Sequence, residues 1–254
     1  MSVLVLEGLS KHFGGLAAVS GCSLSVAAGE VHALIGPNGA GKTTLINLIS
    51  GALQPTQGRI YLDGRDITHL PQHQRVRLGL ARTFQVTNLF NRYTVLENLE
   101  LAVQARSGSS FSFWRPVSRE RQLTHEAEQL SALVGLSGRN HTRVSQLSHG
   151  EQRQLEVGLA LAGRPRLLLL DEPMAGMGLE ESQRMVELIA RLAEGYSLTI
   201  LLVEHDMNAV FQLAQRISVL VYGQVIASGR PEEIRANPEV HRAYLGDEQL
   251  GRQR

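Results

Sequence analysis

Eight consecutive residues offer the clearest chemistry in this chain. Residues 36–43 read Gly-Pro-Asn-Gly-Ala-Gly-Lys-Thr and match the phosphate-binding pattern G-x-x-x-x-G-K-[ST]. Glycines let successive backbone N–H groups point into one concavity that holds an anion. Lys42 can then reach the β- and γ-phosphates of a nucleotide, and the Thr43 hydroxyl can ligate Mg²⁺. The nucleotide-binding residues predicted from this stretch are Gly36, Pro37, Asn38, Gly39, Ala40, Gly41, Lys42, Thr43 and Thr44.

The segments on either side of this loop are the ones that a phosphate site needs. Residues 31–35 are apolar and rich in β-branched side chains, which predicts a buried strand. Residues 44–49 place apolar side chains on neighbouring turns and predict a helix, whose N-terminal dipole favours anions. The alternative is a glycine-rich turn that binds nothing, and the order strand, loop, helix argues against it. The sequence therefore predicts a nucleotide site.

An acidic pair at the end of an apolar run supplies the second half of such a site. Four leucines at residues 167–170 precede Asp171 and Glu172. A buried strand would deliver Asp171 to the sheet edge, where it can hold Mg²⁺ through water. Glu172 can then act as the general base on the attacking water. Many buried strands end in a carboxylate, so this pair carries weight only beside the phosphate loop. Its position after a long helical stretch argues against a kinase or a GTPase.

Two further polar residues follow predicted strands. His205 follows residues 201–204 (Leu-Leu-Val-Glu) at the end of the next predicted strand, at the same predicted edge as Asp171, and an imidazole there can hydrogen-bond a γ-phosphate. Gln85 follows residues 82–84, and its neutral amide could contact both Mg²⁺ and the attacking water. The alternatives are a strand-end histidine that bonds local backbone and a solvated loop glutamine. We expect His205 and Gln85 to serve catalysis, with Gln85 also a metal ligand.

A second candidate anion site opens the helix predicted at residues 146–162. Ser148 and Glu151 have the spacing of a capping box, which is a structural role. The Ser148 hydroxyl and the bare amide of Gly150 at a helix N-terminus also form an anion site. We therefore expect Ser148, Gly150 and Glu151 to belong to a nucleotide-binding group as well as to a cap.

The remaining elements predict an α/β fold with a parallel core sheet. Strands are expected at residues 3–7, 24–26, 31–35, 58–62, 82–85, 167–171, 198–203, 217–221 and 225–227. Helices are expected at residues 71–78, 94–106, 118–134, 146–162, 180–194 and 208–213. Strands alternating with helices favour a parallel sheet, and the early strands favour an antiparallel patch beside it. Helical segments between about residue 71 and residue 163 predict a mostly helical insert.

Bulk composition places few restrictions on function. The apolar content of 43% suits an ordinary globular protein. With 25 basic and 24 acidic side chains, the chain lacks the excess positive charge that is typical of nucleic-acid-binding proteins. The lone Cys22 cannot form an internal disulfide and is expected to pack as a small hydrophobic residue. The sequence begins without a basic leader and contains no apolar run near ~20 residues. A cytoplasmic protein is expected, unless a partner recruits it to a membrane.

Taken together and in this order, residues 36–43, Gln85, residues 147–152, Asp171–Glu172 and His205 resemble the ATPase subunit of ABC transporters. The resemblance implies one ABC ATPase domain of the P-loop NTPase class. Its core and β patch would span about 1–85 and 164–235, its helical insert about 86–163 and its tail about 236–254. In that family two ATPase subunits face each other head to tail, and the Ser148 helix would bind the γ-phosphate held by the opposite subunit. The resemblance also implies that Phe13 stacks on adenine, for which a flat ring is suited; the alternative is a core aromatic.

A narrower resemblance is to the importers of branched-chain (hydrophobic) amino acids, and to the longer of their two ATPase subunits. It rests on residues 13–19, 82–85, 94–99, 203–207 and 237–246. It implies ATP and Mg²⁺, an identical or paralogous ATPase partner, two transmembrane permeases and, indirectly, a periplasmic binding protein. The location implied is the cytoplasmic face of the inner membrane.

Several related ATPases would fit the same motifs. Urea and amide importers share the pattern, so the cargo is not fixed by it. A lipid exporter and a soluble, nucleic-acid-associated ABC ATPase are two further candidates. The charge balance gives no reason to expect nucleic acid.

Two residues depart from the family pattern. His149 stands where glycine is usual, and a side chain there would be costly if the position required positive φ. Gly178 stands where many members carry an aspartate that touches the partner subunit. Residues 107–116 are expected to form a surface loop with exposed aromatic side chains.

Overall fold

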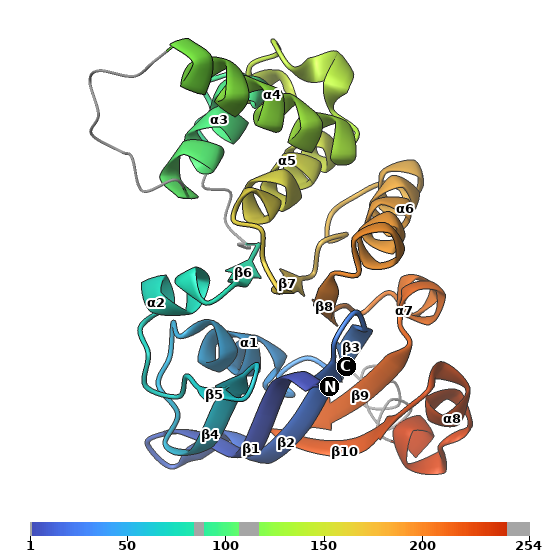
Figure 1. Ribbon diagram of the computed structural model, residues 1–254. Helices are drawn as coiled ribbons and strands as arrows, with labels where there is room; N and C mark the ends of the chain where they lie inside the picture. Colours follow the sequence, from blue (N-terminus) through green and yellow to red (C-terminus); the bar gives the residue numbers. More distant parts are fainter. Residues whose placement is uncertain (1, 84–88, 107–116, 243–254) are drawn as a thin grey trace.

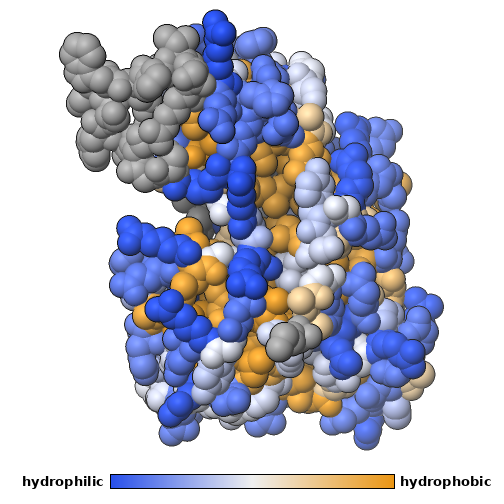
Figure 2. All heavy atoms as spheres, viewed as in Figure 1, coloured by the Kyte–Doolittle hydropathy of each residue, from blue (hydrophilic) through white to orange (hydrophobic). Residues whose placement is uncertain are grey.

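The computed structural model describes residues 2–83, 89–106 and 117–242 (Figure 1). Gln85 and the expected loop at 107–116 lie outside these residues. Within them, no helix is both long enough and apolar enough to cross a membrane. Polar residues dominate the rim of the face in Figure 2, and apolar residues gather toward its centre.

The core of the described chain is a six-stranded sheet, confirming the predicted parallel core. Its strand order is β10-β9-β3-β8-β7-β6. All neighbours run parallel except β10, which pairs antiparallel with β9. The strands are β3 (Val31–Ile35), β6 (Leu80–Arg82), β7 (Leu167–Asp171), β8 (Thr199–Val203), β9 (Arg216–Val221) and β10 (Gln224–Gly229). Because β3, β7 and β8 are parallel, the residues that follow each of them meet at one sheet edge.

A second, antiparallel sheet of order β2-β1-β4-β5 confirms the expected β patch. Its strands are β1 (Ser2–Phe13), β2 (Leu16–Ala27), β4 (Gln57–Leu62) and β5 (Arg65–Asp66). The first two are much longer than the segments 3–7 and 24–26 that the sequence suggests. Their register shifts near Gly8 and Gly21, which both have positive φ. Such bulges interrupt the alternation by which a strand is recognised, so the prediction stopped short.

Helix α1 (Lys42–Ser50) lies between the two sheets. Its Leu45 and Ile49 belong to one buried cluster with Ile60 of β4 and with Leu169 and Leu201 of the parallel sheet. Alternate residues of a strand face opposite sides of the sheet. The side chains on one face of the parallel sheet and those of the antiparallel sheet therefore both pack against α1, the helix that follows the phosphate loop.

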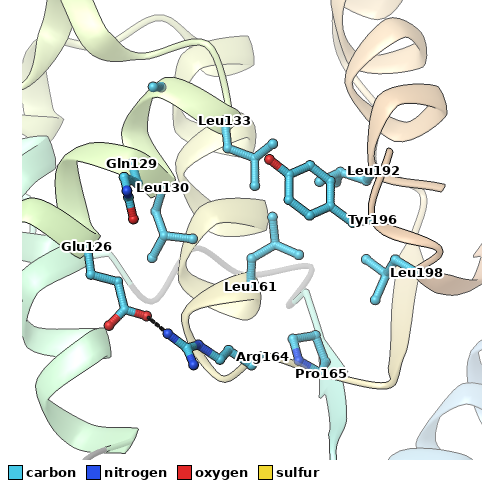
Figure 3. A pocket seen from close by; sticks show the side chains of 11 residues that line it. Glu126, Gln129, Leu130, Leu133, Leu161, Arg164, Pro165, Leu192, Tyr196 and Leu198 are labelled. Atoms are coloured by element: carbon cyan, nitrogen blue, oxygen red, sulfur yellow. Dashed lines mark hydrogen bonds and ion pairs between the residues drawn. The ribbon is translucent and has the colours of Figure 1, made fainter. Parts of the chain in front are cut away.

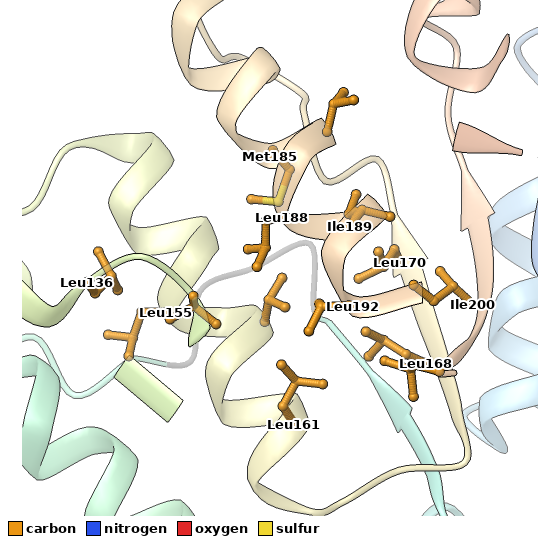
Figure 4. Close-up of a cluster of buried hydrophobic side chains, with 14 of the residues drawn as sticks. Leu136, Leu155, Leu161, Leu168, Leu170, Met185, Leu188, Ile189, Leu192 and Ile200 are labelled. Atoms are coloured by element: carbon orange, nitrogen blue, oxygen red, sulfur yellow. The ribbon is translucent and has the colours of Figure 1, made fainter. Parts of the chain in front are cut away.

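The opposite face of the parallel sheet carries α5 (His149–Ala162) and α6 (Leu179–Tyr196). Leu168 and Leu170 of β7 pack in the same cluster as Leu155 of α5 and Leu188 of α6 (Figure 4). Helices α7 (Met207–Leu213) and α8 (Pro231–Ala236) join a third cluster with β3 and β9.

The mostly helical insert contains α3 (Val95–Arg106), α4 (Val117–Leu133), two 3₁₀ turns and α5. The turns are η1 (Ser137–Arg139) and η2 (Val144–Gln146), so the helix predicted from residue 146 becomes α-helical only at His149. The sequence also suggested helical segments of the insert from residue 71. That start was wrong, because β6 belongs to the core sheet and α2 (Gln72–Arg77) precedes it. In Figure 1 the insert lies on one side of the parallel sheet, with α5 nearest to β7 and with α3 and α4 beyond it.

A buried arginine closes the C-terminal end of α1. The Arg75 guanidinium, fully buried, donates to the carbonyls of Leu48 (2.6 Å) and Ile49 (2.8 Å) in the last turn of that helix. It also donates to the carbonyls of Thr68 and Leu70. Burial lowers the pKa of Arg75 to about 10. A cation at a helix C-terminus is favoured by the helix dipole, so Arg75 stabilises the helix that begins in the phosphate loop.

Candidate nucleotide site

The phosphate loop connects β3 to α1 and is shaped by a glycine that no other residue could replace. Gly41 is the N-cap of α1, with φ of 104°. A Cβ at this position would lie 2.3 Å from the carbonyl oxygen of Ala18. Both the backbone angle and the close approach therefore require glycine here.

Lys42 is buried and its ammonium group is held by the loop itself. Nζ donates to the carbonyl oxygens of Gly36 (2.6 Å) and Pro37 (3.1 Å). Burial lowers the pKa of Lys42, and the carboxylates of Glu172 and Asp171 act in the opposite direction. The lysine is thus preorganised inside the loop, within the field of both acidic residues.

A cavity of about 480 Å³ lies over this loop. It is lined by the predicted residues Asn38, Gly39, Ala40, Gly41, Lys42, Thr43 and Thr44, and by Glu172. The structure therefore brings the phosphate loop and the candidate base to one concavity, although 128 positions separate Glu172 from Thr44 in the sequence numbering.

Four residues of the cavity wall are absent from the sequence prediction. Leu16, Ala17 and Ala18 come from β2, and Tyr222 comes from the turn between β9 and β10. Tyr222 has φ of 47°, and the next N–H, of Gly223, donates to the carbonyl of Ala40 in the phosphate loop (2.8 Å). The sequence indicated only that Tyr222 and Gly223 form a turn. The sheet order, which the sequence did not give, brings this turn next to the phosphate loop.

Asp171 is buried at the end of β7, where it pairs with Arg82. The sequence did not predict a function for Arg82. Its Oδ2 accepts a hydrogen bond from Arg82 Nη2 (3.0 Å). Arg82 Nη1 also donates to Asn47 Oδ1 (2.5 Å) and to Ser50 Oγ (3.2 Å), both on α1. Arg82 therefore links the acidic strand to the helix of the phosphate loop.

The donor set at this edge fits a magnesium ion. The exposed Thr43 hydroxyl and the Asp171 carboxylate are oxygen ligands, which Mg²⁺ prefers. Within the described residues no group of three or more His, Cys, Asp or Glu side chains could hold a metal by itself. Such a sparse set suits Mg²⁺, which usually keeps several waters and takes further oxygens from substrate phosphates.

Glu172 has a backbone conformation that is rare for its residue type. Its φ is 49°, and its N–H donates to the carbonyl of Val203 on the neighbouring strand (2.8 Å). A left-handed non-glycine residue costs on the order of 1 kcal/mol or more, and such strain gathers at functional sites. The turn directs the Glu172 side chain to the cavity wall instead of into the sheet.

His205 follows β8 at the predicted sheet edge, but its side chain does not line the described cavity. The imidazole is 65% exposed, and Nδ1 lies 3.7 Å from Oε2 of Glu204. Glu204 is buried and accepts backbone hydrogen bonds from Met174 (3.0 Å) and His205 (3.0 Å). The Glu204 carboxylate therefore lies close to both the backbone N–H and the imidazole of His205.

Phe13 is the last residue of β1 and is 48% exposed, so it is not a core aromatic. The Lys11 ammonium lies over its ring, 5.2 Å from the centroid. Its cross-strand partner is Leu16, which lines the cavity. Phe13 itself is not among the lining residues, although the hairpin places it next to one of them.

The start of α5 confirms the predicted capping box. The Glu151 N–H donates to Ser148 Oγ (3.2 Å), and the Ser148 N–H donates to Glu151 Oε2 (2.9 Å). Ser148, Gly150 and Glu151 do not line the described nucleotide cavity. Within one chain, the two candidate anion-binding groups are therefore not brought together.

The two departures from the family pattern have simple structural outcomes. His149 is the first residue of α5 and has no positive φ, so the expected backbone cost is absent; its Nε2 lies 3.3 Å from the carbonyl of Ala175. Gly178 is the N-cap of α6 and contributes no side-chain cap. The next residue, Leu179, is 89% exposed.

A larger cavity, of about 720 Å³, lies between α4, the end of α5 and the end of α6 (Figure 3). Leucine is the commonest residue in its wall, and an ion pair between Glu126 and Arg164 (3.0 Å) lies at one side. No residue predicted to do chemistry lines it, so the smaller cavity remains the candidate site.

Comparisons with known proteins agree with this geometry. Residues 19–175 match the family model described as "ABC transporter", and residues 224–249 match "Branched-chain amino acid ATP-binding cassette transporter". The chain is 42% identical to the high-affinity branched-chain amino acid transport ATP-binding protein BraF of Pseudomonas aeruginosa, over 96% of this chain and 98% of BraF. It is 43% identical to the LivG protein of the same description from Salmonella typhimurium, with the same coverage.

Solved structures give the same result. The ATP-binding cassette MJ1267 of an ABC transporter superposes with a TM-score of 0.85 at 32% identity, covering 96% of this chain and 99% of that one. The cassette MJ0796, solved as a dimer in a post-hydrolysis state with ADP and Pi, superposes with a TM-score of 0.76 at 25% identity. The match covers 90% of this chain and 98% of MJ0796.

Proposed function

This chain belongs to the ABC transporter family of ATP-binding subunits, and it binds and hydrolyses ATP to drive transport. From that premise we propose that its cargo is branched-chain or other hydrophobic amino acids, taken up by an importer. The observation that carries the proposal is the match to BraF at 42% identity along 96% of the chain, together with the match at residues 224–249.

We propose a role for each site residue, which its position supports where the structure describes it. The backbone N–H groups that the loop 36–43 offers and the Lys42 ammonium hold the phosphates, while Thr43 and Asp171, with Gln85, would hold Mg²⁺. That ion, when bound, neutralises charge on the β- and γ-phosphates. Glu172, in the cavity wall, accepts a proton from the attacking water.

Two more residues complete the proposed set from outside the cavity wall. His205, exposed at the end of β8, hydrogen-bonds the γ-phosphate. Phe13, beside Leu16, stacks on adenine.

The proposed site is complete only when two ATPase subunits meet. Ser148, Gly150 and Glu151 do not line the described cavity of their own chain, which supports a dimer in which a partner brings its own α5 N-terminus to the nucleotide. A head-to-tail dimer with an identical or paralogous subunit meets that requirement. The dimeric MJ0796 cassette supports such an assembly.

The membrane partners would dock on the surface formed by the interval 85–99, of which the structure describes residues 89–99. Phe90 and Tyr93 are exposed there, and their rings lie 5.6 Å apart. Such an aromatic patch suits a helix from a permease subunit. We infer two permeases, a periplasmic binding protein that acts through them, and a position at the cytoplasmic face of the inner membrane.

Reconstitution tests the cargo directly. The chain, its partner ATPase and the permeases are placed in proteoliposomes with the cognate binding protein, and ATP hydrolysis is measured with different ligands. Leucine, isoleucine or valine should stimulate hydrolysis and accumulate in a manner that requires ATP. Stimulation by urea or a short amide, without a response to leucine, would contradict the proposed cargo and leave the ATPase function intact.

A further inference from the structure

The donors at the start of α5 are already engaged by a carboxylate of the same chain. Glu181, on the first turn of α6, accepts a hydrogen bond from Ser148 Oγ to its Oε1 (2.9 Å). The same oxygen accepts from the backbone N–H of Gly150 (3.3 Å). Glu181 also accepts a backbone hydrogen bond from Gly178, the N-cap of α6.

This carboxylate satisfies the requirements of an anion bound at a helix N-terminus. Its hydrogen bond from Ser148 is the largest effect that lowers the pKa of Glu181, so the group is ionised at neutral pH. A Cβ added to Gly150 would lie 2.8 Å from the Glu181 carboxyl carbon and oxygen. Glycine at position 150 is therefore what allows the carboxylate to approach the helix.

The Ser148 hydroxyl and the Gly150 amide are also the donors offered to a phosphate in the proposed function. Both donors reach one oxygen of Glu181, so a second anion cannot use them while this contact persists. Two like charges at one set of donors repel each other strongly where solvent is excluded.

We propose that Glu181 is a built-in anion that occupies the Ser148–Gly150 donors in the separate subunit and is displaced by the γ-phosphate of the partner's nucleotide. The inference rests on the proposed function, because it takes the α5 N-terminus as half of the shared site. The contact makes dimerisation conditional on the triphosphate. Only a strong anion at the right distance from Ser148 and Gly150 can offset the free energy lost when Glu181 leaves these donors.

The contact also connects the two halves of the fold. Ser148 and Gly150 belong to the helical insert, and Glu181 begins the helix that follows Asp171 and Glu172. Release of Glu181 would remove this polar contact between the insert and the first turn of α6 at the moment when the partner's nucleotide arrives. A ligand can shift such an equilibrium only by binding one state better, and the freed donors provide that difference.

Association of subunits measures the effect. Glu181→Ala and Glu181→Gln are made in a Glu172→Gln background, which is designed to retain ATP, and dimerisation is followed by analytical ultracentrifugation with ATP, with ADP and without nucleotide. The chain is measured alone and together with the shorter ATPase subunit. Glu180→Ala is the matched control, because Glu180 lies on the same turn and pairs with Arg184 at 3.3 Å.

Glu181→Ala should lower the protein concentration for half-maximal ATP-dependent dimerisation by about tenfold for each Glu181 contact that the dimer releases, hence by about a hundredfold in a homodimer that releases two. The tenfold change is the one expected when a binding-competent fraction of about one-tenth becomes the whole population. Glu181→Gln should give a smaller gain, and Glu180→Ala none. The affinity of the separate subunit for ATP, which depends on the Lys42 side of the site, should not change.

A third variant separates displacement from a mere loss of the α6 cap. Adding Ser148→Ala to Glu181→Ala should abolish the gain, because the freed donor is then missing. Equal or weaker dimerisation of Glu181→Ala, or a gain that survives Ser148→Ala, would overturn the inference and leave the proposed function standing. Absence of ATP-dependent dimers in every variant, including the parent, would overturn the shared site itself and the inference with it.

Discussion

At the scale of single residues, the site is defined by which side chains the fold brings to one cavity. The phosphate loop and Glu172 line the same concavity, and Asp171 lies at the same sheet edge in contact with Arg82. The motif residues could be read from the sequence because each motif is short and contiguous. Arg82, Glu181 and Tyr222 could not, because their partners lie far away in the chain and only the sheet order and helix positions bring them together.

Glu172→Gln tests the general base. Glutamine retains the size and the left-handed turn but cannot accept the proton, so kcat should fall by at least about 100-fold while ATP binding persists. ATP turnover of the assembled transporter and equilibrium binding of ATP measure the two effects. Turnover near the wild-type rate would remove Glu172 from this role.

Arg82→Gln tests the link between α1 and the acidic strand. Removing one member of a buried ion pair leaves an uncompensated charge on Asp171, so the free energy of unfolding should fall by about 3–5 kcal/mol. Adding Asp171→Asn should recover part of the loss, as measured by urea unfolding in a double-mutant cycle. Strictly additive costs would show that the pair is not coupled.

Tyr222→Asn tests whether the unexpected wall of the cavity contacts nucleotide. Asparagine tolerates the positive φ of the turn, so only the ring is lost. An aromatic contact is worth about 0.5–1.5 kcal/mol, which corresponds to roughly two- to tenfold weaker ATP binding. Tyr196→Ala, in the wall of the larger cavity, is the control and should bind ATP normally. Unchanged affinity in Tyr222→Asn would mean that the ring only borders the site.

At the scale of elements, most of the fold was accessible from periodicity and motif context. The buried strands at 31–35 and 167–171 agree with β3 and β7, and the long helices agree to within a few residues. Bulges at Gly8 and Gly21 hid the length of β1 and β2, and the three-residue β6 was too short to reveal that it joins the core sheet. Strand pairing depends on contacts between segments that are distant in the sequence, so local sequence patterns do not predict which strands pair.

Arg75→Ala tests how the helix after the phosphate loop is held. Four carbonyl oxygens would lose a charged donor inside the core, so the free energy of unfolding should fall by about 3 kcal/mol or more. Arg77→Ala is the control. It removes an exposed charge from α2, the helix that also carries Arg75, and should cost at most about 0.5 kcal/mol. Urea unfolding compares the two variants. Similar stabilities would show that the α1 end does not depend on Arg75.

At the scale of the whole molecule, one chain presents both of the groups that we propose as halves of a shared site. One half is the cavity with Lys42 and Glu172, and the other is the α5 N-terminus, where Glu181 engages Ser148 and Gly150. Neither half completes the other within the described chain. In the proposed dimer, association of two subunits through ATP would link nucleotide chemistry to a change in subunit contacts, which a transporter needs to move its permeases.

The most direct test is an experimental structure of the Glu172→Gln assembly with ATP and Mg²⁺, in which the distance from Ser148 Oγ to the nearest phosphate oxygen is measured. The account predicts that Ser148 Oγ of one subunit lies about 3 Å from a γ-phosphate oxygen of the nucleotide held by Lys42 of the other. It also predicts that Glu181 has left Ser148 in that state. A closed, ATP-loaded dimer in which Ser148 still bonds Glu181 and lies far from every phosphate would contradict it.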